Sequence, residues 1–214
     1  MRKTQFAPGE YYHIYGRGNE KKDLFLNVRD YCRFLFLLLY FQSNVIINNI
    51  SYHIAIFLKQ QKFKISKETV QKILDNRGVK LIAFSIMPNH FHLILKELQE
   101  GGIPRYMQKI LMAYAKYFNA KYKKTGHVFQ GPFQAVHIED NEQFLYVSSY
   151  VHLNPKDLNK WKNKEHEYPW SSFTDYVTEN RWGELLAVDE ILGQFKNPSE
   201  YKKEVAENNT EEMI

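Results

Sequence analysis

The chain has 214 residues, of which 44% are hydrophobic and 15% aromatic. This fraction of apolar side chains is sufficient to form a buried core. It excludes an intrinsically disordered chain, which would be poor in aromatic residues. The formal net charge is +5, and the single cysteine, Cys32, excludes an intramolecular disulfide and a cysteine-based zinc site.

The N-terminal segment has no apolar stretch followed by a small-residue cleavage site, so we expect no signal peptide. The most apolar run covers residues 34–41 and is far shorter than the roughly 20 residues that cross a bilayer. We therefore expect a cytoplasmic protein with no membrane partner.

The first part of the chain contains a strand and a buried helix. Residues 11–15 (YYHIY) are followed by Gly-Arg-Gly, which predicts a strand that ends in a glycine turn. Residues 28–41 begin with charges and become apolar on several faces, which predicts a buried helix. Within the less regular residues 43–78, Ser66 has the position of an N-cap before a short helix.

Residues 79–98 carry the clearest local pattern in the chain. Two apolar, β-branched runs, VKLIAFSIM and HFHLILKEL, flank the dipeptide Pro88-Asn89. Pro and Asn are turn residues, and runs of this kind form strands. The sequence therefore predicts a β-hairpin.

The rest of the chain alternates between helix and strand. Residues 103–122 have apolar side chains at helical spacing, which predicts a helix. Residues 127–138 have a strand-like or extended character. Residues 140–153 are predicted to form a further helix that ends before Pro155. We expect the acidic tail, residues 196–214, to be a solvated or frayed helix without a site.

The predicted order of strands and helices is β-α-β-β-α-β. This order is compatible with an α+β, ferredoxin-like fold, in which helices pack on an antiparallel sheet. No linker or internal repeat interrupts the chain. We therefore predict one domain over residues 1–195, followed by the acidic tail.

Two histidines lie two residues apart on the second hairpin strand. His90 and His92 face the same side of the strand, because side chains alternate along it. Two imidazoles on a rigid strand can hold a divalent cation if a third ligand joins them. The alternative interpretation is a pair of structural histidines at a strand end.

The helix over residues 140–153 carries a second group of polar residues. Tyr146, Tyr150 and Asn154 are spaced four apart, so they lie on one face near the end of the helix. For any one of these tyrosines, packing in the core is the alternative role. Asn154 before Pro155 could equally be a helix-ending residue.

Between Gly101 and Ile138 the chain has six basic residues and no acidic one, and seven aromatic side chains lie among them. Cations that neutralise phosphates and rings that stack on bases are what single-stranded nucleic acid requires. The alternative is a solvated helix face over an aromatic core.

Together these segments resemble the single-tyrosine HUH transposases, above all the REP-associated tyrosine transposases and small insertion-sequence relatives. The resemblance runs from about residue 11 to 176. It is carried by YYHIYGRGN, MPNHFHLIL, YMQKILMAYAKYFNAKYKKTGHVFQGPF, NEQFLYVSSYVHLNP and YPWSSFTDY. The segment 44–76 is longer than the usual link between the first helix and the hairpin.

The resemblance implies a DNA transposase that cleaves structured single-stranded DNA through a 5′-phosphotyrosine intermediate. Tyr150 matches the nucleophile, and His90, His92 and Asn154 match the ligands of Mg²⁺ or Mn²⁺. His152 points away from this face and is left out of the metal site. The expected partners are hairpin DNA and, in some relatives, a second copy in a homodimer; the expected location is the nucleoid. The cations expected to bind DNA are Arg17, Arg105, Lys109, Lys116, Lys121, Lys123 and Lys124.

Two other functions stay open at this point. The chain could be a domesticated binder of structured single-stranded DNA or RNA that no longer cleaves. It could also be a metal-dependent hydrolase in which His90 and His92 activate water.

Overall fold

The fold was analysed in a computed structural model that describes residues 4–208. The elements follow the order β-α-β-β-α-β, with two extra helices after the first and a helical C-terminal part. This confirms the predicted α+β, ferredoxin-like architecture. The strands are β1 (Tyr11–Arg17), β2 (Val79–Met87), β3 (His90–Glu97) and β4 (Gln134–Ile138). The helices are α1 (Val28–Tyr40), α2 (Ile50–Gln60), α3 (Lys67–Asp75), α4 (Gly102–Tyr122), α5 (Asn141–Leu153), α6 (Phe173–Val177), α7 (Asp189–Leu192) and α8 (Pro198–Glu207).

The four strands form one antiparallel sheet in the order β2-β3-β1-β4. The central strands β1 and β3 pair so that Tyr15 lies opposite His92 and Arg17 lies opposite His90. The C-terminal end of β1 therefore lies beside the start of β3, next to the Pro88-Asn89 turn. Polar side chains from both strands meet at this end of the sheet.

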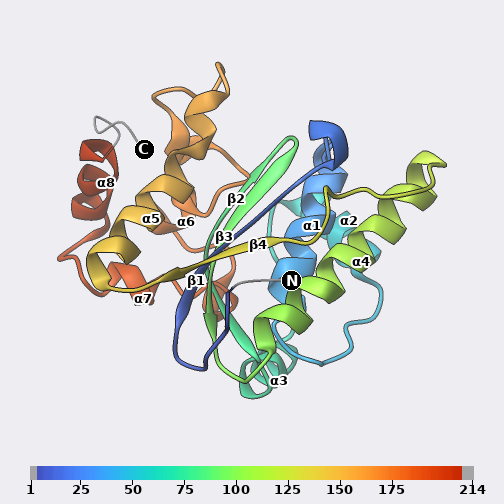
Figure 1. Ribbon diagram of the computed structural model, residues 1–214, viewed down its shortest axis with the longest axis horizontal. Coiled ribbons are helices and arrows are strands. Elements are labelled where there is room, and N and C mark those ends of the chain that lie inside the picture. The colour runs from blue at the N-terminus through green and yellow to red at the C-terminus, as the bar shows by residue number, and fades with distance from the viewer. Residues whose placement is uncertain (1–3, 209–214) are drawn as a thin grey trace.

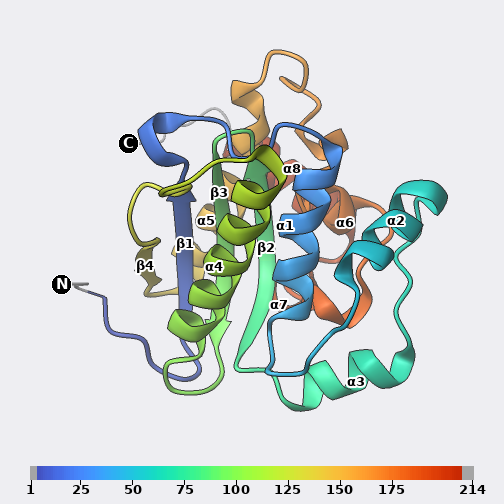
Figure 2. The same cartoon turned by 90° about the vertical axis from the view of Figure 1, so that its right-hand side faces the viewer.

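The two faces of the sheet are covered by different parts of the chain. Helices α1 and α4 pack on one face, whereas α5 and the C-terminal helices pack on the other (Figures 1 and 2). On the α1 side the rings of Phe34 and Phe91 lie 5.1 Å apart. Gly16 faces Phe91 across the strands, and a Cβ atom at this position would lie 2.7 Å from the Phe91 ring. A glycine is therefore needed for the close packing of β1 on β3.

Side-chain caps begin α1, α3 and α5, and the cap at Ser66 was predicted from the sequence. Asn27 and Asp30 form a capping box at the start of α1, and the Ser66 hydroxyl accepts a hydrogen bond from the backbone of Thr69. Asp140 caps α5 by accepting from the backbone N–H of Gln143. These caps satisfy N–H groups that a helix leaves unpaired at its first turn.

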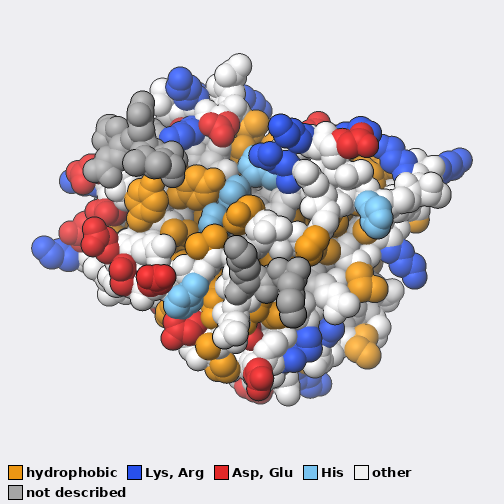
Figure 3. Space-filling view, viewed as in Figure 1, with side chains coloured by type: hydrophobic (Ala, Val, Ile, Leu, Met, Phe, Trp, Pro, Cys, Tyr) orange, Lys and Arg blue, Asp and Glu red, His pale blue; other side chains and the backbone are white. Residues whose placement is uncertain are grey.

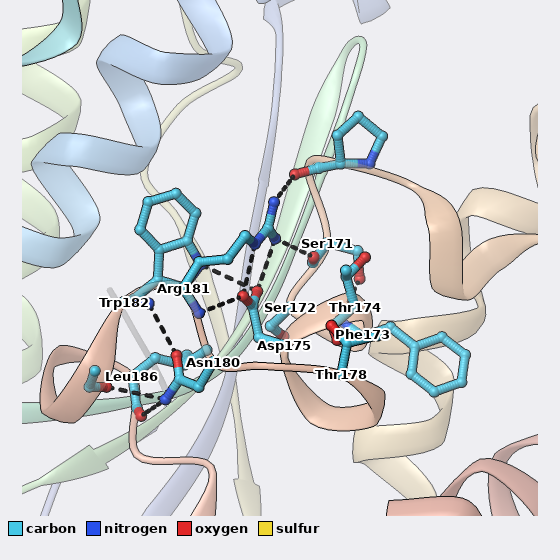
Figure 4. A network of polar contacts seen from close by, with 12 residues as sticks. Ser171, Ser172, Phe173, Thr174, Asp175, Thr178, Asn180, Arg181, Trp182 and Leu186 are labelled. Carbon is cyan, nitrogen blue, oxygen red and sulfur yellow. Dashed lines mark hydrogen bonds and ion pairs between the residues drawn. The ribbon is translucent and has the colours of Figure 1, made fainter. Parts of the chain in front are cut away.

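The C-terminal part of the chain runs along the β2 edge of the sheet. The backbone N–H groups of Ile86 and Ala187 donate to the carbonyls of Trp170 and Leu81, respectively. Figure 4 shows the polar network that folds this segment. The buried Asp175 carboxylate accepts from Arg181 Nε at 2.7 Å and from Trp182 Nε1 at 3.0 Å. The network holds the segment against β2, so this edge of the sheet is covered.

Two sequence-based expectations differ from the structure. The extended segment predicted over residues 127–138 forms a strand only from Gln134. The tail forms the expected helix over residues 198–207, but the expectation that this helix is frayed or solvated was wrong, because α8 buries Tyr201 and Val205 against the rest of the chain. Residues 209–214 of that predicted tail lie outside the described residues.

Within residues 4–208, no helix combines the length and the apolar character needed to span a membrane.

Candidate active site

A cleft of about 480 Å³ opens at the end of the sheet where β1 and β3 meet. Its lining comes from strands β1 and β3, the segment 130–134 that leads into β4, the C-terminal end of α5 and the turn that follows α5. Figure 3 shows histidine side chains gathered in the middle of this face, with hydrophobic side chains on one side and Lys and Arg on the other. The residues that line the cleft are Tyr15, Gly16, Arg17, His90, Phe91, His92, Gln130, Pro132, Gln134, Tyr150, Asn154 and Asp157.

The structure brings His90, His92, Tyr150 and Asn154 together in this cleft. The rings of His90 and His92 are 5.2 Å apart and perpendicular, and the Tyr150 ring lies edge-on to His92 at 5.3 Å. His92 and Asn154 are 8% and 7% exposed, so their polar atoms are largely shielded from water. All four side chains come from one chain.

The hydrogen bonds around His90 determine which of its nitrogens carries the proton. Asn89 Nδ2 donates to the carbonyl of Lys21 at 3.1 Å, which turns Asn89 Oδ1 toward His90 Nδ1 at 2.7 Å. Because Oδ1 can only accept, His90 Nδ1 must carry the hydrogen. Burial lowers the pKa of His90, with the Asn154 side chain opposing the shift. The neutral ring therefore presents a lone pair at Nε2.

The orientation of the Asn154 amide is also fixed. Its Nδ2 donates to the backbone carbonyl of Tyr150 at 2.9 Å, so Oδ1 points the other way. Asn154 Oδ1 lies 3.3 Å from His90 Nε2. Two acceptor atoms thus face each other with no hydrogen between them. A cation placed between them would relieve that contact, because both lone pairs would then point at positive charge.

The pair His90 and Asn154 has the spacing of two ligands of one divalent metal ion. Two ligands about 2.1 Å from one octahedral ion lie about 3.0 Å apart, close to the 3.3 Å between His90 Nε2 and Asn154 Oδ1. Within residues 4–208 no three side chains of the types His, Cys, Asp and Glu are placed to hold a metal together. A site in this cleft would therefore need an additional kind of donor. The candidate ligands are two imidazoles, of His90 and His92, and the amide oxygen of Asn154.

Tyr150 is half-buried at the edge of the cleft. Burial raises the pKa of its phenol, and the hydrogen bond with the Asn154 side chain acts in the opposite direction. At neutral pH the hydroxyl is therefore protonated. A phenol in this state is a weak nucleophile that needs activation within the site.

Sequence reasoning missed His13 and Tyr15 on β1. The Nε2 atom of His13 lies 2.8 Å from Nδ1 of His92, and the two rings stack at 5.1 Å. Burial lowers the pKa of His13 to about 4, so this ring is neutral at pH 7. Alternation along residues 11–15 puts both side chains on one face of β1. Their proximity to His92 depends on strand pairing, which one sequence does not reveal.

The cations predicted to bind DNA do not form one cluster. Arg17 lines the cleft beside His90. Arg105 and Lys109 lie in the first half of α4 around a separate small cavity, and Lys109 donates to the Asn44 side chain. The remaining cations, at the far end of α4 or just after it, are Lys116, Lys121, Lys123 and Lys124.

Of these cations, Lys121 is paired with a carboxylate of the same chain. Its Nζ lies 2.5 Å from a carboxylate oxygen of the fully buried Asp30, and it also donates to the Tyr117 hydroxyl. Tyr122 donates to the other Asp30 oxygen at 2.5 Å. The α1–α4 interface thus uses Lys121 as a structural cation, which makes it the least available of the predicted contacts to DNA.

His152 lies on the opposite side of α5 from the cleft, as predicted. It is completely buried, with Nδ1 2.6 Å from the Tyr201 hydroxyl and Nε2 2.8 Å from Ser172 Oγ. Its ring stacks on Phe173 at 5.0 Å. Burial lowers the pKa of His152 to about 3. His152 therefore joins α5 to the C-terminal segment and lies away from the candidate metal ligands.

Comparisons with protein families and with solved structures find matches. Comparison with curated proteins finds no match. One solved structure, described as a REP-associated tyrosine transposase bound to a REP hairpin, is 15% identical with a TM-score of 0.52, and the alignment covers 85% of this chain and 87% of that one. At this identity the likeness establishes the fold. The profile of the IS200-like transposases matches residues 46–154, which include His90, His92, Tyr150 and Asn154. The chain therefore belongs to the IS200-like transposase family.

Proposed function

We propose that this protein is a metal-dependent endonuclease and strand transferase that cleaves structured single-stranded DNA through a 5′-phosphotyrosine intermediate. The observation that carries this proposal is the meeting of Tyr150 with His90, His92 and Asn154 in one cleft. Each side chain matches a chemical need of the reaction, and the family is one of transposases.

In the proposed reaction the Tyr150 oxygen attacks the phosphorus of a phosphodiester. A bond forms between the phenolic oxygen and phosphorus, and the bond from phosphorus to the 3′ oxygen breaks. The phenol gives up its proton and the departing 3′ oxygen takes one up, so the net proton transfer is from Tyr150 to the free 3′-hydroxyl. Because one phosphodiester replaces another, the reverse attack by a 3′-hydroxyl rejoins strands without an external energy source.

His90, His92 and Asn154 would hold Mg²⁺ or Mn²⁺, which supplies positive charge to the scissile phosphate. Imidazole and amide donors suit Mn²⁺ slightly better. His90 Nε2 and Asn154 Oδ1 already face each other as acceptors, so these residues keep their orientation when the ion is bound. Arg17 at the cleft would orient the phosphate through its planar guanidinium.

The proposed substrate is a DNA hairpin with a flanking single strand. The solved structure with the same fold holds a REP hairpin, and the α4 segment of this chain has basic and aromatic side chains without an acidic one. Phosphate contacts from lysines would position the DNA, whereas base contacts would set its sequence. Such an enzyme would act at the nucleoid, in the cytoplasm.

A single chain supplies all of the proposed catalytic side chains. The Tyr150 ring lies 5.3 Å from the His92 ring of the same chain, so no second copy is needed to complete the site. We therefore expect the monomer to cleave, and homodimer formation is not required by the proposed mechanism.

The test is a denaturing gel with a labelled hairpin DNA and Mn²⁺, comparing wild type with Tyr150→Phe. Tyr146→Phe is a matched control, because Tyr146 lies one turn away on the same helix and lines a different cavity. The expected result is a labelled, protein-sized band in wild type and in the control and none in Tyr150→Phe.

Other results would contradict the proposal in distinct ways. Nicking without an adduct by both wild type and Tyr150→Phe would indicate a hydrolase that activates water. A native-gel shift without any cleavage would indicate a binding protein on a transposase fold.

A further inference from the structure

The two histidines of the proposed metal site have different neighbours at Nδ1. His90 Nδ1 lies against an amide oxygen, Asn89 Oδ1, which fixes its tautomer. His92 Nδ1 lies 2.8 Å from Nε2 of a third histidine, His13. Imidazole nitrogens donate in one tautomer and accept in the other. The state of His92 therefore depends on His13.

The sheet register explains why these two rings meet. Tyr15 lies directly opposite His92, and His13 lies opposite Ile94, so His13 and His92 are diagonal neighbours on the same face. Long side chains reach across such diagonals. The Tyr150 ring packs edge-on against His13 at 5.6 Å, and the Tyr15 ring lies 5.2 Å from it. These contacts hold His13 in its position under the cleft.

Only one of the two possible hydrogen bonds leaves His92 able to bind a metal. If His13 Nε2–H donates, His92 Nδ1 uses its lone pair as the acceptor and the remaining nitrogen, Nε2, carries the hydrogen. That ring has no lone pair for a metal. If His92 Nδ1–H donates, its Nε2 is free to ligate, and His13 must carry its own hydrogen on Nδ1.

We propose that His13 is a positioning residue that accepts the Nδ1–H of His92 and so holds the His92 ring in the tautomer and orientation that bind the metal. This inference rests on the proposed function, because it assigns His13 a role toward the proposed metal ion. The residue His13 is only partly buried, and its Nδ1 atom is not one of the buried side-chain atoms that lack a hydrogen-bond partner. Histidine ligands of metals are commonly oriented by such an acceptor at the other nitrogen.

The first experiment measures the tautomers directly. Ring-¹⁵N-labelled wild-type protein, without metal or DNA, is examined at neutral pH by two-bond ¹H–¹⁵N correlation. The expected result is a hydrogen on Nδ1 of both His13 and His92, identified by comparison with His13→Phe and His92→Gln. A hydrogen on Nε2 of His92 would overturn the inference, whatever the protein does with DNA.

The second experiment measures Mn²⁺ affinity by electron paramagnetic resonance. His13→Phe keeps a ring but removes the acceptor, whereas His13→Gln places an amide oxygen at the same distance along the side chain as Nε2. We expect Mn²⁺ binding to weaken about 10- to 100-fold in His13→Phe and to recover in His13→Gln. His137→Phe, at an outward-facing histidine of β4 that contacts Glu10, is the matched control and should bind as wild type.

The outcomes separate the inference from the proposed function. Equal Mn²⁺ affinity in wild type and His13→Phe would overturn the positioning role while leaving the metal site intact. A wild-type protein that binds no Mn²⁺ would contradict the metal site of the proposed function, and the tautomer measurement would still decide the hydrogen bond. Three Mn²⁺-coupled imidazoles in place of two would show that His13 is itself a ligand, which also contradicts the inference.

Discussion

The two sides of helix α5 both carry polar side chains, but one side faces an open cleft and the other faces the protein interior. One side carries Tyr150 and Asn154 into the open cleft. The other carries His152 into a sealed cluster with Ser172 and Tyr201. Each polar atom of the His152 ring has a partner inside the protein, whereas the facing acceptors of His90 and Asn154 lack a hydrogen between them. Satisfied polar groups stabilise a fold, and unsatisfied ones at a cleft indicate a ligand.

The largest effect is expected on the open side. His90→Ala removes a proposed metal ligand, and a loss of about 4 kcal/mol of transition-state stabilisation corresponds to roughly a 1,000-fold lower cleavage rate. Hairpin binding should change little, because phosphate contacts supply most of the affinity. Single-turnover cleavage and a native-gel titration measure the two quantities. An equal loss of both would mean that His90 is structural.

On the buried side of α5, a substitution should lower the stability of the protein. His152→Ala removes two buried hydrogen bonds and a ring stacked on Phe173, so the free energy of unfolding should drop by about 3 kcal/mol. Urea denaturation measures it. His127→Ala, at an exposed histidine, should stay within about 0.5 kcal/mol of wild type. A stability loss as small as that control would show that the cluster does not anchor α5.

The contribution of buried His152 to stability should also depend on pH. The pKa of His152 is lowered by burial to about 3, below the value of about 6.5 for an unfolded chain. The unfolded state then binds the extra proton first, so stability present above pH 6.5 is lost as the pH falls toward 3. Between pH 7.5 and 4.5 the wild type should lose about 2–3 kcal/mol more than His152→Ala. Parallel pH profiles would contradict this assignment.

The smallest effect concerns the cations of α4. Within residues 4–208, no ion pair involves Lys116 or Lys123, and both are exposed, in contrast to Lys121 with its Asp30 partner. Replacing both by Gln should weaken hairpin binding several-fold and reduce the salt dependence of log K by about 0.7 per lysine. Lys121→Gln should instead lower thermal stability. Unchanged salt dependence in the double variant would remove these lysines from the DNA interface.

Local periodicity predicted the fold, whereas the resemblance to the transposase motifs singled out the four residues that the structure brings together in the cleft. His90 and His92 share a strand face, and Tyr150 and Asn154 share a helix face, whichever strands pair. The role of Lys121 depends on which helices touch, and the contact of His13 with His92 depends on strand order. Neither can be inferred from residues nearby in the sequence.

The C-terminal helix shows a signal that could have been found. Tyr201 and Val205 are spaced four apart in an otherwise charged segment, as on the buried stripe of a helix. The abundance of glutamate concealed the stripe. The composition of a segment is an average over all sides of a helix, whereas packing depends on the side chains of one side.

Judged by composition alone, removal of the charged residues after 195 would be expected to leave the fold unchanged. Trimming would remove the Tyr201 hydroxyl and leave Nδ1 of His152 without its partner, deep under the helix that carries Tyr150. An unpaired buried polar atom costs about 1–3 kcal/mol. Shortened versions of this gene would thus tend to lose the alignment of the tyrosine helix, even with every cleft residue intact.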